Sequence, residues 1–386
     1  KKCIMTIAVI SMIRDNWGGS EELWAAMAEE AFKQKNKVIH LAYEYKFIHP
    51  KMQSLIDKGL ISYTRPSYIE TSSNHFFQLT GKSINFLRKK INNSFKKIFL
   101  QKPDIVIYNG TCYSIAGEKT LMKYLNNSNA AFYIIGHFND ERGRGGISNY
   151  EAQLIKKTYQ LAKKVFFISE RSMHNAARQL AFEMPNALVI RNPVNLISTE
   201  IIHYPNNDCI QMATVGNLIT VHKGQDIVLE VLSSDAWKQR NWHLNIYGSG
   251  EDEAYLKNLV DFYKLDQRVT FHGKVQDIRG VWTKNHILLM PSHMEGMPLA
   301  VVEAMLCGRV CVATDVGGIA EWIEEEISGF IADAPTVTSF GKAMEKAWKH
   351  LEEWEAIGRN AHERAMQLYD PEPGKTLLKL ITQSIA

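Results

Sequence analysis

The sequence predicts an α/β protein that consists of two doubly wound, parallel-sheet domains. Short apolar runs alternate with helical stretches in the first half of the chain, and the alternation restarts after a polar, irregular segment at 192–208. Strands that alternate with helices form parallel sheets covered by helices on both faces. The length of 386 residues also exceeds what one hydrophobic core usually supports. We therefore expect one domain over 1–195 and a second over 196–370.

The predicted strands of the first half share short, almost wholly apolar runs, which are typical of strands buried on both faces. These runs are Ile4–Ser11, Val38–Tyr43, Asp104–Asn109, Ala131–His137, Val165–Ser169 and Ala187–Ile190. Helical periodicity lies between most of them, as in Glu21–Lys35 and Arg171–Leu180. Gly18 and Gly19 form the first strand-to-helix turn, and Ser20 is expected to cap the helix that follows.

The second half repeats the pattern with five more apolar runs. They are Ile210–Val215, His243–Tyr247, Val269–His272, Ile287–Pro291 and Val310–Ala313. Pro371 and Pro373 break the helical region near the end of the chain. Ligands of open parallel sheets bind outside the carboxyl ends of the strands, so a binding site is expected in the segments after these runs.

Composition excludes several classes of protein. No run approaches 18 apolar residues, so no transmembrane helix is expected. The five cysteines, scattered and without metal-ligand spacing, indicate free thiols in a reducing compartment, and we expect a cytoplasmic protein. No G-x-G-x-x-G follows the first strand, which disfavours a dinucleotide-dependent dehydrogenase.

The charge of the chain is uneven, because residues 1–205 hold 28 Lys and Arg against 16 Asp and Glu. Within this basic half, Gly81–Lys102 shows apolar residues at helical spacing beside a series of lysines. The ordinary interpretation is a core-packed helix with a solvated basic face. The alternative is a helix that binds an anionic membrane surface, on the inner face of the membrane. Nucleic acid is not an expected partner, since no nucleic-acid motif accompanies the charge.

The most informative stretch places Glu295 and Glu303 eight positions apart around a strand-to-helix turn. An apolar strand precedes Glu295, and a helix with Pro298 in its first turn contains Glu303. The N–H groups of Met297, Leu299 and Ala300 would then converge beside Glu295. The N-terminus of a helix, with its unpaired N–H groups, is a binding site for phosphate.

Two other interpretations compete for this glutamate pair. A solvated helix face is the ordinary one for two arbitrary glutamates. A glycosidase acid/base pair is disfavoured, because eight helical residues span roughly 12 Å and glycosidase carboxyl groups stand about 5 to 9.5 Å apart. A carboxylate at each end of a phosphate-binding turn better suits a nucleotide-sugar, which has hydroxyls at both ends and a diphosphate between.

Several ordered motifs resemble glycosyltransferase family 4, whose members are retaining enzymes of the GT-B fold. E-G-M-P-L-A-V-V-E at 295–303 is similar to the E-x7-E signature of that family. The other matching motifs are V-G-N-L-x5-K-G at 215–224, I-Y-G-S-G at 246–250, V-x-F-H-G at 269–273 and T-D-V-G-G-I-A-E at 314–321. The resemblance implies two Rossmann-like domains with a cleft between them, and a C-terminal segment, 371–386, that crosses back to the first domain.

The same resemblance implies a role for individual residues. Glu295, Lys223 and His137 are the predicted catalytic residues, with Glu295 facing the developing positive charge and His137 near the transferred sugar. Glu303 would hold the ribose hydroxyls, and Lys223 the diphosphate. Asn217 departs from the family, which usually has Arg there, so more of the phosphate contact would depend on Lys223. The full donor-binding set is Gly18, Gly19, Asn217, Lys223, Gly248, Ser249, Lys274, Val275, Glu295, Gly296, Met297, Pro298, Leu299 and Glu303.

The predicted function is retaining transfer of a hexose-type sugar from a nucleotide-diphosphate donor, UDP- or GDP-linked. The acceptor would be a glycan or a lipid-linked molecule of cell-envelope or polysaccharide biosynthesis. The alternative is a non-catalytic nucleotide-sugar or glycan-binding protein of the same fold, which Asn217 favours. We expect no cofactor and no metal ion, because backbone amides and Lys223 supply positive charge beside the leaving diphosphate.

Overall fold

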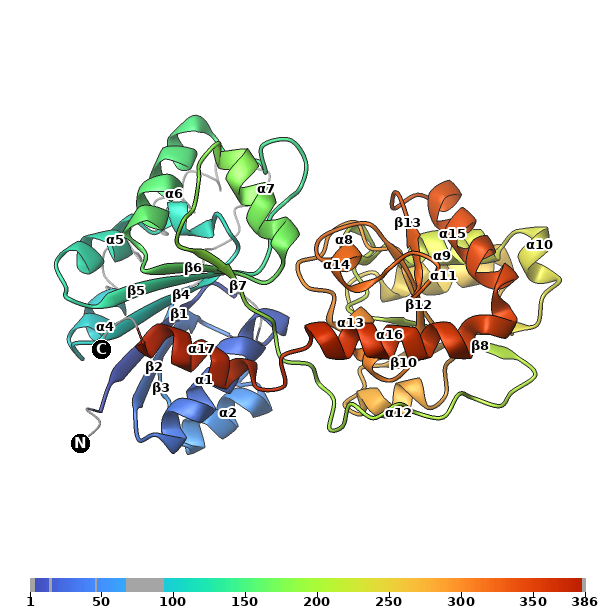
Figure 1. Cartoon of the computed structure of the whole chain (residues 1–386), viewed down its shortest axis with the longest axis horizontal. Helices are drawn as coiled ribbons and strands as arrows, with labels where there is room; N and C mark the ends of the chain where they lie inside the picture. Colours follow the sequence, from blue (N-terminus) through green and yellow to red (C-terminus); the bar gives the residue numbers. More distant parts are fainter. Residues whose placement is uncertain (1–3, 14–15, 46, 67–93, 384–386) are drawn as a thin grey trace. The chain divides into compact units, whose positions relative to one another are not determined.

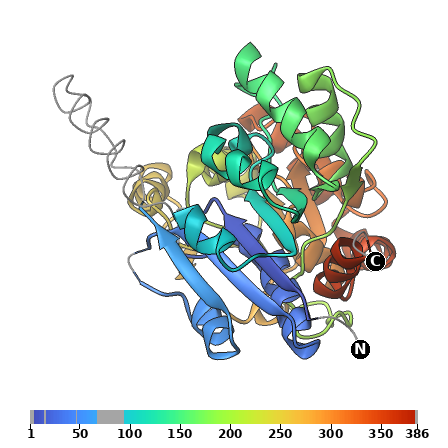
Figure 2. The same cartoon turned by 90° about the vertical axis from the view of Figure 1, so that its left-hand side faces the viewer.

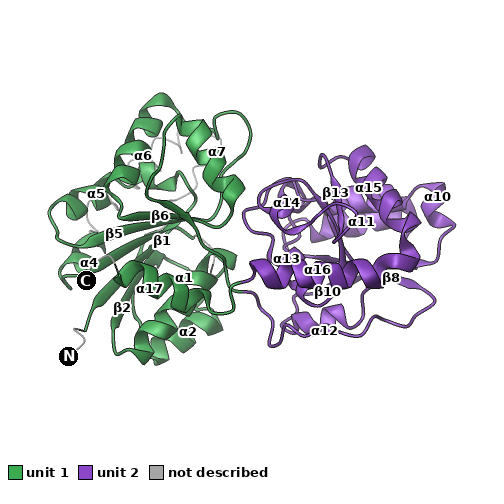
Figure 3. Cartoon of the chain, in the orientation of Figure 1, with its two compact units in different colours: residues 1–193, 370–386 green, residues 194–369 purple. Residues whose placement is uncertain are grey.

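The computed structural model describes residues 4–13, 16–45, 47–66 and 94–383. The chain forms two compact units, one of residues 1–193 with 370–386 and one of residues 194–369 (Figure 3). Each unit contains one parallel sheet with helices around it (Figure 1). The prediction of two parallel-sheet α/β domains is therefore confirmed.

Unit 1 contains a seven-stranded sheet of order β3-β2-β1-β4-β5-β6-β7, in which every pairing is parallel. Its strands are β1 Thr6–Ser11, β2 Lys37–Tyr43, β3 Ile61–Arg65, β4 Ile105–Gly110, β5 Ala131–Gly136, β6 Lys164–Phe167 and β7 Ala187–Val189. Its helices are α1 Gly19–Lys33, α2 Pro50–Asp57, α4 Ser94–Phe99, the 3-10 helix Ser114–Gly117, α5 Lys119–Asn126, α6 Asn149–Leu161, α7 Glu170–Leu180 and α17 Pro373–Thr382.

The sheet of unit 1 separates two apolar clusters, because successive strand side chains point to opposite faces. Ile7 and Val9 of β1 pack in a cluster with α1, α2 and α17, whereas Ala8 and Ile10 pack with α4, α5, α6 and α7. Figure 2 shows the strands of this unit from the side. Burial of both faces explains why these strands read as continuous apolar runs.

The C-terminal helix α17 belongs to unit 1 and packs along α1 (Figure 1). Leu377, Leu378 and Ile381 are buried in the cluster that α1 lines. The Tyr133 hydroxyl donates to the carbonyl of Ile381 at 2.8 Å. Pro371 and Pro373 lie at the junction between α17 and the preceding helix, which ends at Leu368.

Unit 2 contains a six-stranded parallel sheet of order β10-β9-β8-β11-β12-β13. Its strands are β8 Ile210–Val215, β9 Trp242–Tyr247, β10 Val269–Gly273, β11 Ile287–Met290, β12 Val310–Thr314 and β13 Phe330–Ala332. Its helices are α8 Thr220–Lys223, α9 Gln225–Leu232, α10 Asp235–Lys238, α11 Glu253–Tyr263, α12 Ile278–Trp282, α13 Leu299–Leu306, α14 Ile319–Trp322, α15 Val337–Lys349, the 3-10 helix Leu351–Glu353 and α16 Trp354–Leu368. Helices α9, α11 and α15 share one apolar cluster with the sheet.

Two predicted helix starts are wrong by one or two residues. Ser20 is not the cap of α1, because the helix already begins at Gly19 and Gly18, with extended backbone, is its cap. Pro298 precedes α13 as its cap instead of standing in the first turn. Both shifts leave the turns themselves in the expected places after β1 and β11.

The stretch Gly81–Lys102, interpreted as a core-packed helix or alternatively as a membrane-binding one, lies mostly outside the described residues. Its described part contains α4, in which Phe95 and Ile98 are buried while Lys96 and Lys97 are exposed. Helix α4 therefore turns its apolar side to the core of unit 1. Within the part of the chain that the structure describes, no helix is long and apolar enough to cross a membrane.

Candidate functional site

Loops from four strands of unit 2 meet closely at the carboxyl edge of its sheet. A Cβ on Gly248, after β9, would lie 1.8 Å from the carbonyl oxygen of Gly216, after β8. A Cβ on Gly317, after β12, would lie 2.2 Å from the carbonyl oxygen of Glu295, after β11. Both glycines also have positive φ, so only glycine fits there without strain. The glycine-rich motifs of the sequence thus bring these loops into contact.

Lys223 and Glu295 form an ion pair within this set of loops. The Lys223 Nζ lies 2.5 Å from Glu295 Oε1, and the Glu295 side chain is only 8% exposed. Asp252 positions the short helix α8 that carries the lysine, since its Oδ2 accepts from the Thr220 N–H at 2.6 Å and from the Thr220 hydroxyl at 2.9 Å. Two residues predicted to act together, 72 positions apart in the chain, are therefore side by side.

Helix α13 begins at Leu299, four residues after Glu295, and its first turn offers backbone N–H groups. The carbonyl of Pro298 accepts from the N–H groups of Val301 and Val302 at 2.9 and 3.1 Å. The N–H groups of Leu299 and Ala300 precede the first intrahelical bonds of the helix and have no acceptor inside it. The predicted phosphate-binding turn thus lies at the same edge as the Lys223–Glu295 pair.

The other predicted sugar-donor residues of unit 2 lie on neighbouring loops of this edge. The Gly248 N–H donates to the carbonyl of Gly273 at 2.8 Å, which brings Lys274 and Val275 beside the β9 loop. The carbonyl of Ser249 accepts from the Leu218 N–H at 3.1 Å. The β8, β9 and β10 loops are thus joined by backbone hydrogen bonds.

Two of the predicted donor-binding residues, Asn217 and Glu303, make contacts within the protein that the sequence did not predict. Asn217 is exposed, and its carbonyl accepts from the Gln225 amide at 2.9 Å. Glu303 is 3% exposed, and its carboxylate accepts from the backbone N–H of Asn195 at 2.9 Å. Glu303 therefore holds the segment that enters unit 2, and its proposed contact with ribose stays a prediction.

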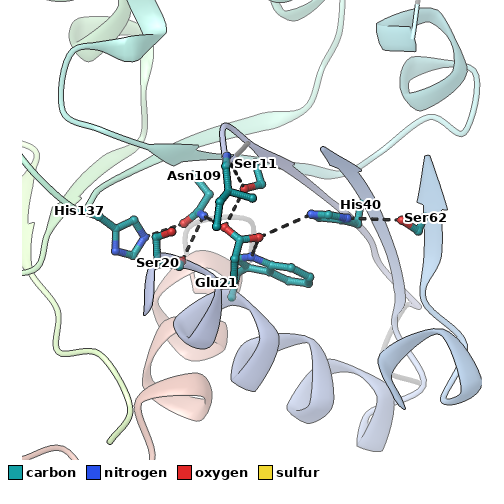
Figure 4. Close-up of polar contacts among 9 residues, drawn as sticks. Ser11, Ser20, Glu21, His40, Ser62, Asn109 and His137 are labelled. Atoms are coloured by element: carbon teal, nitrogen blue, oxygen red, sulfur yellow. Dashed lines mark hydrogen bonds and ion pairs between the residues drawn. The ribbon is translucent and has the colours of Figure 1, made fainter. Parts of the chain in front are cut away.

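Of the predicted residues of unit 1, His137 belongs to a second, buried cluster at the carboxyl edge of the other sheet (Figure 4). His137 directly follows β5, and its Nε2 lies 2.7 Å from Asn109 Oδ1 at the end of β4. Burial lowers the pKa of His137 to about 4. Gly18 and Gly19 begin α1 on the same edge, and the Asn109 amide donates to the carbonyl of Ser20 at 3.1 Å.

Glu21 lies at the centre of this cluster, fully buried on the first turn of α1. Its carboxylate accepts from Ser11 Oγ at 2.7 Å, from Trp24 Nε1 at 2.8 Å and from Asn109 Nδ2 at 3.0 Å. Burial raises the pKa of Glu21 to about 7, although these three donors act in the opposite direction. Burial also lowers the pKa of the neighbouring His40 to about 3.

Sequence reasoning did not select Glu21 or Asn109. A signal for each is present in the sequence, because Asn109 is a polar residue at the end of an apolar run and Glu21 lies just before the apolar run at 23–28. Among the described residues, no group of three or more His, Cys, Asp or Glu side chains could hold a metal ion.

A glycine-lined edge, a partly buried ion pair and the N-terminus of a helix are together typical of an α/β unit that binds a phosphorylated ligand. The comparisons with known proteins indicate the family that this unit resembles. Residues 210–350 match the family model described as "Glycosyl transferases group 1".

Two curated relatives extend this likeness. An uncharacterized glycosyltransferase of Haemophilus influenzae is 32% identical over 168 residues, which cover 43% of this chain and 47% of that protein. The human relative is one of the subunits of phosphatidylinositol N-acetylglucosaminyltransferase and is 29% identical over 185 residues, which cover 47% of this chain and 38% of that protein. The chain thus spans less than half the length of these relatives.

The structure of Anabaena Alr3699/HepE in complex with UDP aligns with 99% of this chain and 99% of its own, at a TM-score of 0.71 and 16% identity. That likeness shows the fold, which is the two-domain GT-B fold expected from the sequence. Residues 210–350 thus resemble group 1 glycosyltransferases, and the chain as a whole shares the fold of the Anabaena protein.

Proposed function

We propose that this protein is a retaining glycosyltransferase that moves a hexose-type sugar from a nucleotide-diphosphate donor to a glycan or lipid-linked acceptor. The observation that carries the proposal is the Lys223–Glu295 pair, 2.5 Å apart, beside the first turn of α13. A cation and open N–H groups suit the diphosphate, and a nearby carboxylate suits the sugar that leaves it.

The proposed transfer step uses the positive charge of Lys223 and the negative charge of Glu295. The bond between the anomeric carbon and the diphosphate oxygen breaks while an acceptor hydroxyl forms its bond on the same face of the sugar. The hydroxyl proton passes to the departing phosphate oxygen, so no enzyme nucleophile is required. Lys223 and the N–H groups of Leu299 and Ala300 stabilise the negative charge that develops on the diphosphate, and Glu295 stabilises the positive charge on the sugar. Glu303 would bind the ribose hydroxyls, and Lys274 and Val275 would flank the base.

Uracil is the proposed base, because the structurally similar Anabaena protein was crystallised with UDP. N-acetylglucosamine is the first sugar to test, because the human relative is named for its transfer to phosphatidylinositol. That name also supports a lipid-linked acceptor. Action at the inner surface of a membrane, in cell-envelope or polysaccharide biosynthesis, is a further part of the proposal.

Lys223→Ala is expected to weaken UDP binding by roughly 10- to 150-fold. The variant removes a charge-assisted contact to phosphate, and such contacts contribute about 1.5 to 3 kcal/mol. UDP should raise the melting temperature of the unmodified chain much more than that of the variant. Release of UDP from UDP-N-acetylglucosamine and other UDP-sugars, with an acceptor present, measures turnover.

The matched control is Lys257→Ala, which removes a lysine from an exposed ion pair on α11 of the same unit. This control should bind UDP as the unmodified chain does. If the Lys223 variant binds UDP as tightly as the unmodified chain does, the diphosphate does not bind at this edge of the sheet. UDP binding without transfer to any acceptor would favour the non-catalytic alternative, to which Asn217 in place of the usual arginine also points.

Turnover is expected to be independent of divalent cations. In the proposed site the positive charge beside the diphosphate comes from Lys223 and backbone N–H groups, which a chelator does not remove. Initial rates with and without EDTA should agree within about twofold. A loss of activity that Mg²⁺ or Mn²⁺ restores would show that a metal ion takes part.

A further inference from the structure

Hydrogen bonds connect Glu21 on α1 to the ring of His137 after β5 through Asn109 at the end of β4 (Figure 4). We propose that Asn109, oriented by Glu21, holds His137 in the tautomer that has its proton on Nε2, so that Nδ1 accepts a hydrogen bond from a hydroxyl of the bound sugar. Glu21 and Asn109 are then positioning residues. The identity of the ligand as a sugar rests on the proposed function, whereas the tautomer does not.

The orientation of the Asn109 amide follows from its two other neighbours. Its Nδ2 lies 3.1 Å from the carbonyl oxygen of Ser20 and 3.0 Å from Glu21 Oε1. Neither oxygen has a proton to give when the carboxylate is ionised, so the opposite orientation would place Oδ1 against two acceptors. The amide therefore donates to both of them and turns Oδ1 toward His137.

The tautomer of His137 follows in turn. Its Nε2 lies 2.7 Å from Asn109 Oδ1, which can only accept, so Nε2 must donate. The lowered pKa, about 4, keeps the ring neutral at pH 7, and a neutral imidazole has one N–H and one lone pair. The lone pair therefore resides on Nδ1.

Nδ1 of His137 is buried and has no hydrogen-bond partner among the residues that the structure describes. A buried acceptor without a partner is costly, and it indicates a ligand that supplies the missing donor. A histidine with a pKa near 4 is a poor base at neutral pH, so recognition of a hydroxyl suits it better than proton abstraction.

Two further hydrogen bonds hold the Glu21 carboxylate in place. Ser11 and Trp24 donate to its two oxygens, and the Trp24 ring stacks on His40 with centroids 4.5 Å apart. A carboxylate that accepts from three buried donors on three elements has little freedom to rotate. If Glu21 takes up a proton, Oε2 is its place, because Oε2 lies 3.9 Å from His40 Nε2 while Oε1 accepts from both Ser11 and Asn109. The contact to Asn109 thus persists in either state of Glu21.

The tautomer can be measured directly by long-range ¹H–¹⁵N NMR on the full chain without ligand, with the His137 signals assigned by their loss in His137→Gln. We expect a neutral ring with its proton on Nε2 throughout pH 6 to 8. A ring with its proton on Nδ1, or an imidazolium ring at pH 7, would overturn the proposal. This measurement needs no functional variant and does not depend on glycosyl transfer.

Glu21→Gln tests the role of the carboxylate. Trp24 can only donate, so the carbonyl oxygen of the substituted amide should face Trp24 and its NH₂ group should face Asn109. Only the Ser20 carbonyl then still favours the original orientation of the Asn109 amide. In the opposite orientation, Asn109 turns its oxygen toward the new NH₂ group and offers His137 a donor. We expect at least a tenfold fall in the ratio of the Nε2–H to the Nδ1–H tautomer. An unchanged ratio in a folded variant would overturn the role of Glu21.

Glu29→Gln is the matched control, because it makes the same change of carboxylate to amide on α1, in an exposed ion pair with Lys58. Its tautomer ratio and turnover should equal those of the unmodified chain. In Glu21→Gln, His137 no longer positions the bound sugar, and such misplacement lowers turnover of a UDP-sugar on the order of 10²-fold. Binding of UDP alone should be unchanged. Failure of the unmodified chain to transfer any sugar would contradict the proposed function but not the tautomer.

Discussion

Glu295→Gln is expected to lower sugar transfer by roughly 10²- to 10³-fold, the usual loss when one group that stabilises transition-state charge is removed. Glutamine has nearly the same shape and can still accept from Lys223, so the loops at this edge should keep their structure. What disappears is the negative charge of a side chain that is 8% exposed and 2.5 Å from the Lys223 ammonium. Because Lys223 is then no longer neutralised by a carboxylate, UDP binding should be unchanged or tighter.

Initial rates with a UDP-sugar measure sugar transfer, and titration with UDP measures the affinity for UDP separately. Glu253→Gln is the control, since it removes the acidic member of the exposed Glu253–Lys257 pair on α11 and should leave both unchanged. If Glu295→Gln retains transfer within about threefold, Glu295 does not stabilise the sugar. If transfer and UDP binding fall together, Glu295 acts only by placing Lys223, and the role of the carboxylate in the chemical step must be abandoned.

The two sheets could be predicted because strands buried on both faces appear in the sequence as continuous apolar runs. The strands that escaped prediction lack that signal. Ile61–Arg65 is the edge strand of unit 1, and four of its five residues are not fully buried. Phe330–Ala332 has only three residues at the edge of unit 2, which is too short for a pattern.

The site of unit 2 could be predicted in part because its residues lie in local motifs just after strand ends. Lys223, Glu295 and the α13 turn each follow a strand, and parallel strands bring their carboxyl ends to one edge. The cluster of unit 1 could not, because Asn109 lies inside a strand and Glu21 inside a helix, where no recognised motif marks them. Glu21 and Asn109 are 88 positions apart, and Asn109 and His137 are 28 apart. Only a three-dimensional structure reveals that these polar side chains face one another.

Arg309 is another buried polar residue that the sequence did not reveal, and its substitution has the largest expected effect on stability. It precedes β12 in an apolar stretch, and its side chain is completely buried without a carboxylate beside it among its described contacts. Its guanidinium donates to six backbone carbonyls. They belong to Ile202, His203, Trp282, Asn285, Cys307 and Gly308.

These contacts join three parts of unit 2. Ile202 and His203 belong to the irregular segment that leads into the sheet, and Arg279 also holds that segment through the carbonyls of Ser198 and Glu200, at 2.9 and 2.8 Å. A segment without helix or strand must satisfy its carbonyls by other means. Arg309 supplies donors for it and for the ends of the two neighbouring elements at once.

Arg309→Met is therefore expected to lower the free energy of unfolding of unit 2 by about 3 to 5 kcal/mol, because methionine fills the space but leaves buried carbonyls without donors. The corresponding fall in melting temperature is on the order of 10 °C. Arg309→Lys should have a smaller effect, since an ammonium retains a charge and three of the donors.

Tryptophan fluorescence during urea unfolding is a suitable measurement, because six of the eight tryptophans lie in unit 2. Arg359→Met on α16 is the control; it removes an arginine whose side chain is 55% exposed and paired with Glu355. Exposed pairs of this kind contribute little, so its unfolding midpoint should match that of the unmodified chain. If Arg309→Met unfolds at the same midpoint as this control, water or a rearranged backbone satisfies the carbonyls, and Arg309 does not hold the segment in place.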